Sequence, residues 1–123
     1  MAVAESQGIQ SHLLPMIATG FCSGVSRTGG FCGALSGAIM GLGLLTGRRE
    51  PGASVDENYT LVQELIEQFE IKFGSINCRQ LTGVHLGTPE GQAEFRAKNQ
   101  IANCLNYAEE ATRIVLSLVN QKD

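Results

Sequence analysis

One uncharged stretch, residues 29–47, constrains the fold of this chain more than any other feature. Its nineteen residues contain no charged side chain and repeat small residues at intervals of four. Gly33, Gly37 and Gly41 therefore share one face of a helix. Each glycine costs a helix interior about 1 kcal/mol relative to alanine, so their repetition predicts close contact with another backbone or a cofactor. We expect a central helix that is buried nearly all round.

The same stretch has to be weighed as a membrane span, because Arg48 and Arg49 follow it as a charged flank. A bilayer requires about 20 consecutive apolar residues, and this stretch is slightly shorter. No second stretch of the kind occurs in the chain. We therefore predict no membrane span and interpret residues 29–47 as a buried core helix.

Length and composition exclude several classes of protein. A chain of 123 residues favours one domain, here 1–123, with residues 1–8 frayed. A net charge of −3 and nine scattered basic residues argue against a nucleic-acid partner. The N-terminus lacks a basic segment followed by an apolar core, so we expect no signal peptide and a cytoplasmic protein. Cytoplasmic thiols stay reduced unless they bind metal or do redox work. The sequence leaves open whether the protein forms a homodimer.

Apolar residues recur at helical spacing through most of the chain, and no alternating strand pattern appears. We predict an all-α, single-domain helical bundle around the glycine-rich helix. Besides that helix, we expect one over residues 9–21, one over 56–73, a short one that Ser75 caps and that ends near Gly83, and one from 90 or 92 to 120. The last helix should turn Ile101, Cys104 and Leu105 inward.

Four cysteines remain to be explained. Cys22 precedes the central helix, and Cys32 begins it, where unpaired N–H groups and the helix dipole favour a thiolate. Cys78 belongs to the short helix and Cys104 to the last one. Their spacing matches no zinc knuckle, thioredoxin-type Cys-x-x-Cys or bacterial ferredoxin run. Spacing alone therefore leaves a shared site and four independent packing thiols both open.

The cysteine segments resemble a redox-active family named for its Cys, Cys-Gly-Ala-x-x-Gly, Cys, Cys pattern. Residues 21–24 and 30–40 carry the first resemblance, with Cys32 to Gly37 as the Cys-Gly-Ala-x-x-Gly element. Residues 73–75 followed by 78–83 resemble the third-cysteine motif, and Cys104 fits the fourth. The resemblance spans residues 17–108. It implies a small bacterial or archaeal helical protein of redox role, often associated with oxidoreductase or transporter systems. Related domains occur in larger electron-transfer proteins with haem and an iron–sulfur centre.

These observations lead us to expect an electron-transfer protein that serves a redox partner protein. Four thiolates match the ligand count of an iron–sulfur cluster, most simply [2Fe–2S]. The expected ligands are Cys22, Cys32, Cys78 and Cys104, with Gly33, Gly37 and Arg79 in support. Covalent c-type haem is not expected, because the chain has no Cys-x-x-Cys-His.

Other functions stay open. In a cofactor-free thiol protein, Cys32 would be the attacking thiol and Cys22 its resolving partner. A structural zinc site with four cysteine ligands would stabilise the fold without redox work, and an inert helical interaction module would use no thiol chemistry. Arg27 and Arg79 flank cysteine segments, where they are candidates for binding an anionic partner. We expect no catalytic residues of the hydrolase or transferase kind.

Overall fold

The computed structural model describes residues 2–120 and confirms an all-α domain. Within these residues the only β pairing is an isolated antiparallel bridge between Phe31 and Asn77. The helical elements, in chain order, are α1 (Ala2–Ser6), α2 (Leu13–Ala18), the 3-10 turn η1 (Thr19–Phe21), α3 (Cys22–Arg27), α4 (Gly33–Thr46), α5 (Asp56–Phe73), α6 (Cys78–Thr82), α7 (Pro89–Ala97) and α8 (Gln100–Asn120).

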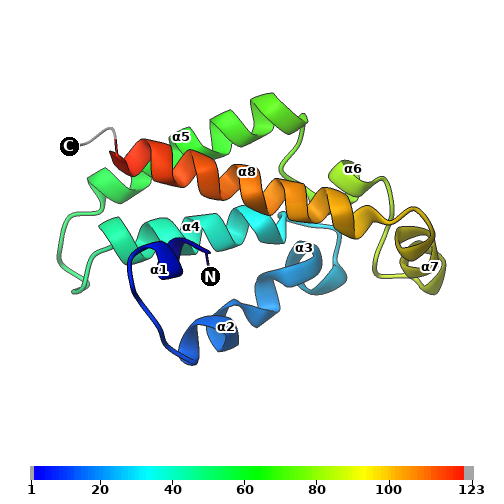
Figure 1. The fold of residues 1–123 in the computed structure, drawn as a ribbon, viewed down its shortest axis with the longest axis horizontal. Coiled ribbons are helices and arrows are strands. Elements are labelled where there is room, and N and C mark those ends of the chain that lie inside the picture. Colours follow the sequence, from blue (N-terminus) through cyan, green and yellow to red (C-terminus); the bar gives the residue numbers. More distant parts are fainter. Residues whose placement is uncertain (1, 121–123) are drawn as a thin grey trace.

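Three long helices, α4, α5 and α8, lie side by side and enclose the core (Figure 1). Helix α5 has the bounds that its apolar face predicted, and Gly74 ends it at a φ of 85°, in the left-handed region where glycine is favoured. The largest of the fully buried side chains between these helices are Leu35, Leu42, Leu65, Phe69 and Val115. The remaining short elements α3, α6 and α7 gather at the end where α4 begins (Figure 1).

The central helix α4 is present, but it is not buried all round. Gly41 is buried, and a β-carbon there would lie 2.8 Å from the Val3 Cβ. Gly37, by contrast, is exposed and has nothing within 4 Å of the same point. The expected close contact along the whole glycine face is therefore wrong at Gly37. No helix within residues 2–120 is long and apolar enough to cross a membrane.

The N-terminal segment is better ordered than its composition predicted. Fraying over residues 1–8 is wrong for α1, because Val3 and Ala4 are only 4% and 3% exposed. Their burial against α4 explains why a five-residue helix persists there. Residue 1 lies outside the described residues. The helix expected over 9–21 is shorter, as α2 and η1, and its Leu13, Ile17 and Phe21 side chains are exposed.

The last predicted helix is in fact two. The chain breaks between α7 and α8 at Lys98 and Asn99, where Asn99 has a φ of 52°. Asparagine tolerates this left-handed conformation better than most residues, which makes it a suitable break point. Ile101 and Leu105 are 53% and 65% exposed and line the cavity described below, so the expectation that they turn into the core is wrong.

Candidate functional site

All four cysteines line one cavity of about 410 Å³. Each comes from a different place in the fold: Cys22 begins α3, Cys32 caps α4, Cys78 begins α6, and Cys104 lies in the second turn of α8. The lining residues come mainly from α3, α6, α7 and the starts of α4 and α8. Figure 1 shows these elements at one end of the bundle. The fold thus gathers residues that the sequence spacing left unconnected.

Backbone hydrogen bonds around the isolated β-bridge hold Cys32 and Cys78 beside each other. The Cys32 N–H donates to the Ile76 carbonyl at 2.8 Å, and the Cys78 N–H donates to the Gly30 carbonyl at 2.7 Å. These bonds flank the antiparallel pair Phe31 and Asn77. Both cysteines then lead directly into a helix. Their backbones are therefore fixed relative to each other, although 46 positions separate them in the sequence.

The turn that carries Cys22 has an unusual backbone. Within α3, Ser23 to Ser26 have positive φ and ψ, and Arg27 continues with a φ of 70°. Left-handed backbone costs an ordinary residue about 1–2 kcal/mol, and a β-branched residue such as Val25 adopts it least readily. Contacts with the rest of the fold must hold the turn in place. Strained backbone of this kind occurs preferentially at functional sites.

Two glycines let this turn approach the other cysteines. A β-carbon on Gly24 would lie 2.4 Å from the Cys78 Cβ and 3.1 Å from its Sγ. A β-carbon on Gly33 would lie 3.1 Å from the Phe21 carbonyl oxygen and 3.3 Å from the Cys22 Cα. The glycine that follows Cys32 therefore serves to seat the Cys22 backbone on the start of α4.

The four cysteines differ in how deeply they are buried. Cys22 is exposed, Cys104 is half-buried, and Cys32 and Cys78 are buried. Burial raises the pKa of the Cys78 thiol above its ordinary value, the neighbouring Cys32 raises it further, and Thr82 partly opposes the shift by hydrogen bonding. Burial also raises the pKa of Cys104, with added repulsion from Cys78 and then Cys32. These three thiols therefore interact electrostatically within the cavity.

Tyr107 lies beside the same three thiols. Burial raises the pKa of its hydroxyl, and Cys104, Cys32 and Cys78 add repulsion in that order. The hydroxyl donates to the Leu81 carbonyl at 3.2 Å, and the ring packs edge-on against Phe73, with 4.8 Å between centroids. Tyr107 therefore joins the cavity wall to the core of the bundle.

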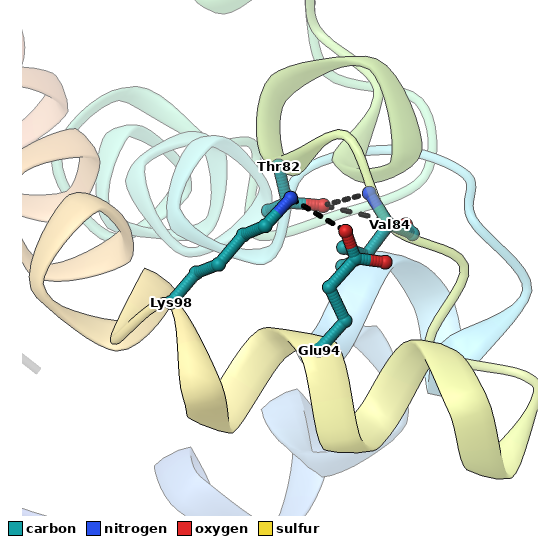
Figure 2. Close-up of polar contacts among 4 residues, drawn as sticks. All are labelled: Thr82, Val84, Glu94 and Lys98. Carbon is teal, nitrogen blue, oxygen red and sulfur yellow. Dashed lines mark hydrogen bonds and ion pairs between the residues drawn. The ribbon is translucent and has the colours of Figure 1, made fainter.

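Thr82 fixes the loop between α6 and α7, which forms another wall (Figure 2). Its buried hydroxyl donates to the Cys78 carbonyl at 2.8 Å and accepts from the Val84 N–H at 3.3 Å. On α7, Glu94 and Lys98 pair one turn apart on the helix surface (Figure 2). Phe95 and Arg96, from the same helix, line the cavity.

Only some of the expected supporting residues line the cavity. Gly33 lines the cavity, whereas Gly37 does not. Arg79 also lies outside the lining, because its side-chain stem packs over Gly29. Arg27, considered for binding an anion, does line the cavity.

The sequence analysis did not identify Arg96 and Tyr107 as candidate site residues. Tyr107 follows Cys104 by three positions, so helical spacing could have found it. Arg96 gave no such signal, because its position depends on the unpredicted break before α8.

The two histidines do not join the site. His12 lies before α2, and His85, in the loop before α7, accepts a hydrogen bond from the Gly87 N–H at its Nδ1. Within residues 2–120, no three side chains among His, Cys, Asp and Glu are arranged to hold a metal ion.

Comparison with known proteins agrees with the cysteine pattern. No curated protein and no solved structure matches the chain. Residues 1–118 match the family described as putative redox-active protein (C_GCAxxG_C_C). The match covers nearly the whole chain and all four cysteines. The protein belongs to this redox-active C_GCAxxG_C_C family.

Proposed function

We propose that the protein transfers electrons to and from a redox partner, with Cys22, Cys32, Cys78 and Cys104 holding an iron–sulfur cluster. The observation that supports this most is the shared cavity, which all four cysteines line from four separate segments. Independent packing thiols would have no reason to converge. Four cysteine thiolates are also the usual ligand set of [2Fe–2S] and [4Fe–4S] clusters, which supply one-electron chemistry when bound.

The four cysteines could also hold a single structural zinc ion, because structural zinc sites use the same four-cysteine ligand set. The family description favours the cluster, since it is of a redox-active protein and zinc does no redox chemistry.

The electrostatics of the site support the same proposal. The raised pKa values of Cys78 and Cys104 mean that bare thiolates there are destabilised by burial and by one another. Bound iron would offset that repulsion, and ligand binding would release the thiol protons. The protein's part is to hold the cysteines together and to exclude water with apolar walls such as Leu81 and Phe95.

Thiol–disulfide exchange is a second candidate, which one contact favours. Gly33 brings the Cys22 backbone against the start of α4, directly beside Cys32. The roles would be the reverse of those expected, because Cys22 is exposed while Cys32 is only 6% exposed. An incoming disulfide would meet Cys22 first, and Cys32 would resolve the mixed disulfide.

Anaerobic reconstitution with iron and sulfide tests the first proposal. The loaded protein should contain iron and sulfide and show visible absorption that reduction bleaches. Cys104→Ser should diminish or abolish this absorption. Ser36→Ala is the matched control, because Ser36 is buried on α4 but does not line the cavity. Four freely titrating thiols with no bound iron would refute the cluster. A Cys22–Cys32 disulfide that forms on oxidation and survives Cys104→Ser would then support thiol exchange.

A further inference from the structure

The cavity differs in charge from the chain as a whole. The protein carries a net charge of −3, yet the lining contains two arginines, Arg27 and Arg96, and no aspartate or glutamate among the described residues. A negative protein should repel small anions over most of its surface. At this cavity the fixed charges of the side chains have the opposite sign.

Neither guanidinium group is used elsewhere in the described structure. Arg27 and Arg96 are exposed, and no ion pair or side-chain hydrogen bond within residues 2–120 involves them. Arg113, in contrast, pairs with Glu109 and Glu110. Both cavity arginines can therefore bind an added anion without first breaking an internal contact.

The two arginines come from walls that the fold presses together. A β-carbon on Gly87 would lie 2.9 Å from the Arg27 carbonyl oxygen, so the Arg27 turn packs against the loop that leads into α7. Arg96 lies on α7 itself. Uncharged side chains complete the lining, most of them apolar, with Ser23, Thr82 and Gln92 as polar exceptions. Two of the apolar ones, Ile101 and Leu105, are more than half exposed. The mouth is therefore both cationic and apolar.

We propose that this cavity binds a small organic anion with an apolar body, held by Arg27 and Arg96 and brought into contact with the cysteines. A volume of about 410 Å³ lies in the range of small-molecule sites, which combine apolar walls with a few fixed polar groups. The proposal names the reactant class for the proposed redox site. The binding step itself requires only the cavity, so it can be tested without a cluster.

Disulfide probes of different charge test the proposal on the reduced, metal-free full chain. The reaction rate of the dianion 5,5′-dithiobis(2-nitrobenzoate) with the protein is compared with that of neutral 4,4′-dithiodipyridine. Each rate is divided by the rate at which the same probe reacts with the small thiol N-acetylcysteinamide, which corrects for the probe's own reactivity. A protein thiolate attacks one probe sulfur, a protein–probe disulfide forms, the probe S–S bond breaks, and an aromatic thiolate leaves with the electron pair. The dianion should have a relative advantage of at least about threefold at low salt, and the advantage should fall as salt rises.

Matched variants locate the source of that advantage. Arg27→Gln combined with Arg96→Gln should abolish it. Arg48→Gln combined with Arg49→Gln removes the same charge from outside the cavity and should leave it largely intact. All four side chains are exposed, and circular dichroism checks that both proteins fold. The proposal would be overturned if the dianionic probe had a lower relative rate than the neutral probe. It would also be overturned if both double variants lost the advantage of the dianionic probe equally.

A competitor tests the apolar half of the claim. Naphthalene-2-sulfonate should slow the dianionic probe several-fold, whereas methanesulfonate at the same ionic strength should not. Equal effects of the two sulfonates would show that the cavity selects charge alone and would refute an apolar-bodied ligand. These readouts do not depend on iron, so a failure here leaves the cluster proposal standing, and a failure of iron loading leaves this one standing.

Discussion

Cys78 packs directly onto the backbone of Gly24. A β-carbon on Gly24 would lie 2.4 Å from the Cys78 Cβ, much closer than two carbon atoms can approach. The Gly24 carbonyl accepts from the Gly30 N–H, and the Gly30 carbonyl accepts from the Cys78 N–H. This chain of contacts ties the turn of Cys22 to the helix of Cys78, so the arrangement of the cysteines depends on a missing side chain.

Gly24→Ala should therefore destabilise the fold by about 2 kcal/mol or more, because it adds a steric clash to a left-handed residue. Urea unfolding of the reduced protein measures the loss. Gly83→Ala is the matched control, since Gly83 also has a positive φ, of 74°, but has nothing within 4 Å. If both variants lose the same stability, the backbone conformation alone matters and the packing argument fails.

Alanine substitutions at two glycines of α4 should change the stability of the protein in opposite directions. Gly37→Ala should stabilise the protein by about 0.5–1 kcal/mol, because Gly37 is exposed and alanine is the better helix former. Gly41→Ala should lose stability, because the new methyl group meets the Val3 side chain. Thermal unfolding compares the two.

A double-mutant cycle checks the cause. Val3→Ala shortens the side chain that obstructs Gly41, so Gly41→Ala should cost less in that background. An unchanged cost would mean that α1 does not pack there. Destabilisation by Gly37→Ala would instead restore the sequence expectation of a fully contacted glycine face.

The sequence predicted local features well and contacts between distant segments poorly. The bounds of α5 and the left-handed stop at Gly74 followed from periodicity and glycine chemistry, which act over one or two turns. The break at Asn99 left no periodic signature, and residues on both sides of it, Arg96 and Leu105, line the cavity. Helical spacing alone could not predict where a long helical segment divides.

The same limit applies to the candidate site. The family resemblance identified the four cysteines as a set, whereas spacing alone left their convergence open. The glycine repeat predicted that Gly33 contacts another backbone, and it does, but the repeat could not show that this backbone is that of Cys22. Left-handed backbone at Ser23 and Val25 was not predictable, because neither residue favours it.

Replacing Val25 tests the strain in that turn. Val25→Gly should stabilise the protein by up to about 1 kcal/mol, because glycine adopts a φ of 53° without the steric cost that valine bears. Val25→Ala is the control, because alanine removes the branched side chain but keeps the β-carbon that makes this φ unfavourable. It should be neutral or destabilising. A loss in Val25→Gly as large as in the control would indicate that the turn is not strained.

The reduced, metal-free protein should lose stability as the pH rises above 9. Burial raises the pKa of Cys78 and of Cys104 above the ordinary value of 9.0, so the folded state binds these protons more tightly than the unfolded state. The stability that these two protonated thiols contribute is fully present below pH 9. It is lost as the pH rises through their raised pKa values. Tyr107, whose pKa is raised from 10.0, acts in the same direction at higher pH.

Urea unfolding between about pH 8 and pH 11 measures this dependence as a slope of the unfolding free energy. Cys78→Ala combined with Cys104→Ala should flatten the slope above pH 9, whereas Cys22→Ala, at an exposed position, should leave most of it. The double variant removes one buried and one half-buried thiol, and the control removes one exposed thiol, so the comparison tests whether burial of the thiols causes the slope. If the slope is the same in the double variant, other groups cause the loss of unfolding free energy above pH 9. The effect of burial on Cys78 and Cys104 would then be refuted as its cause.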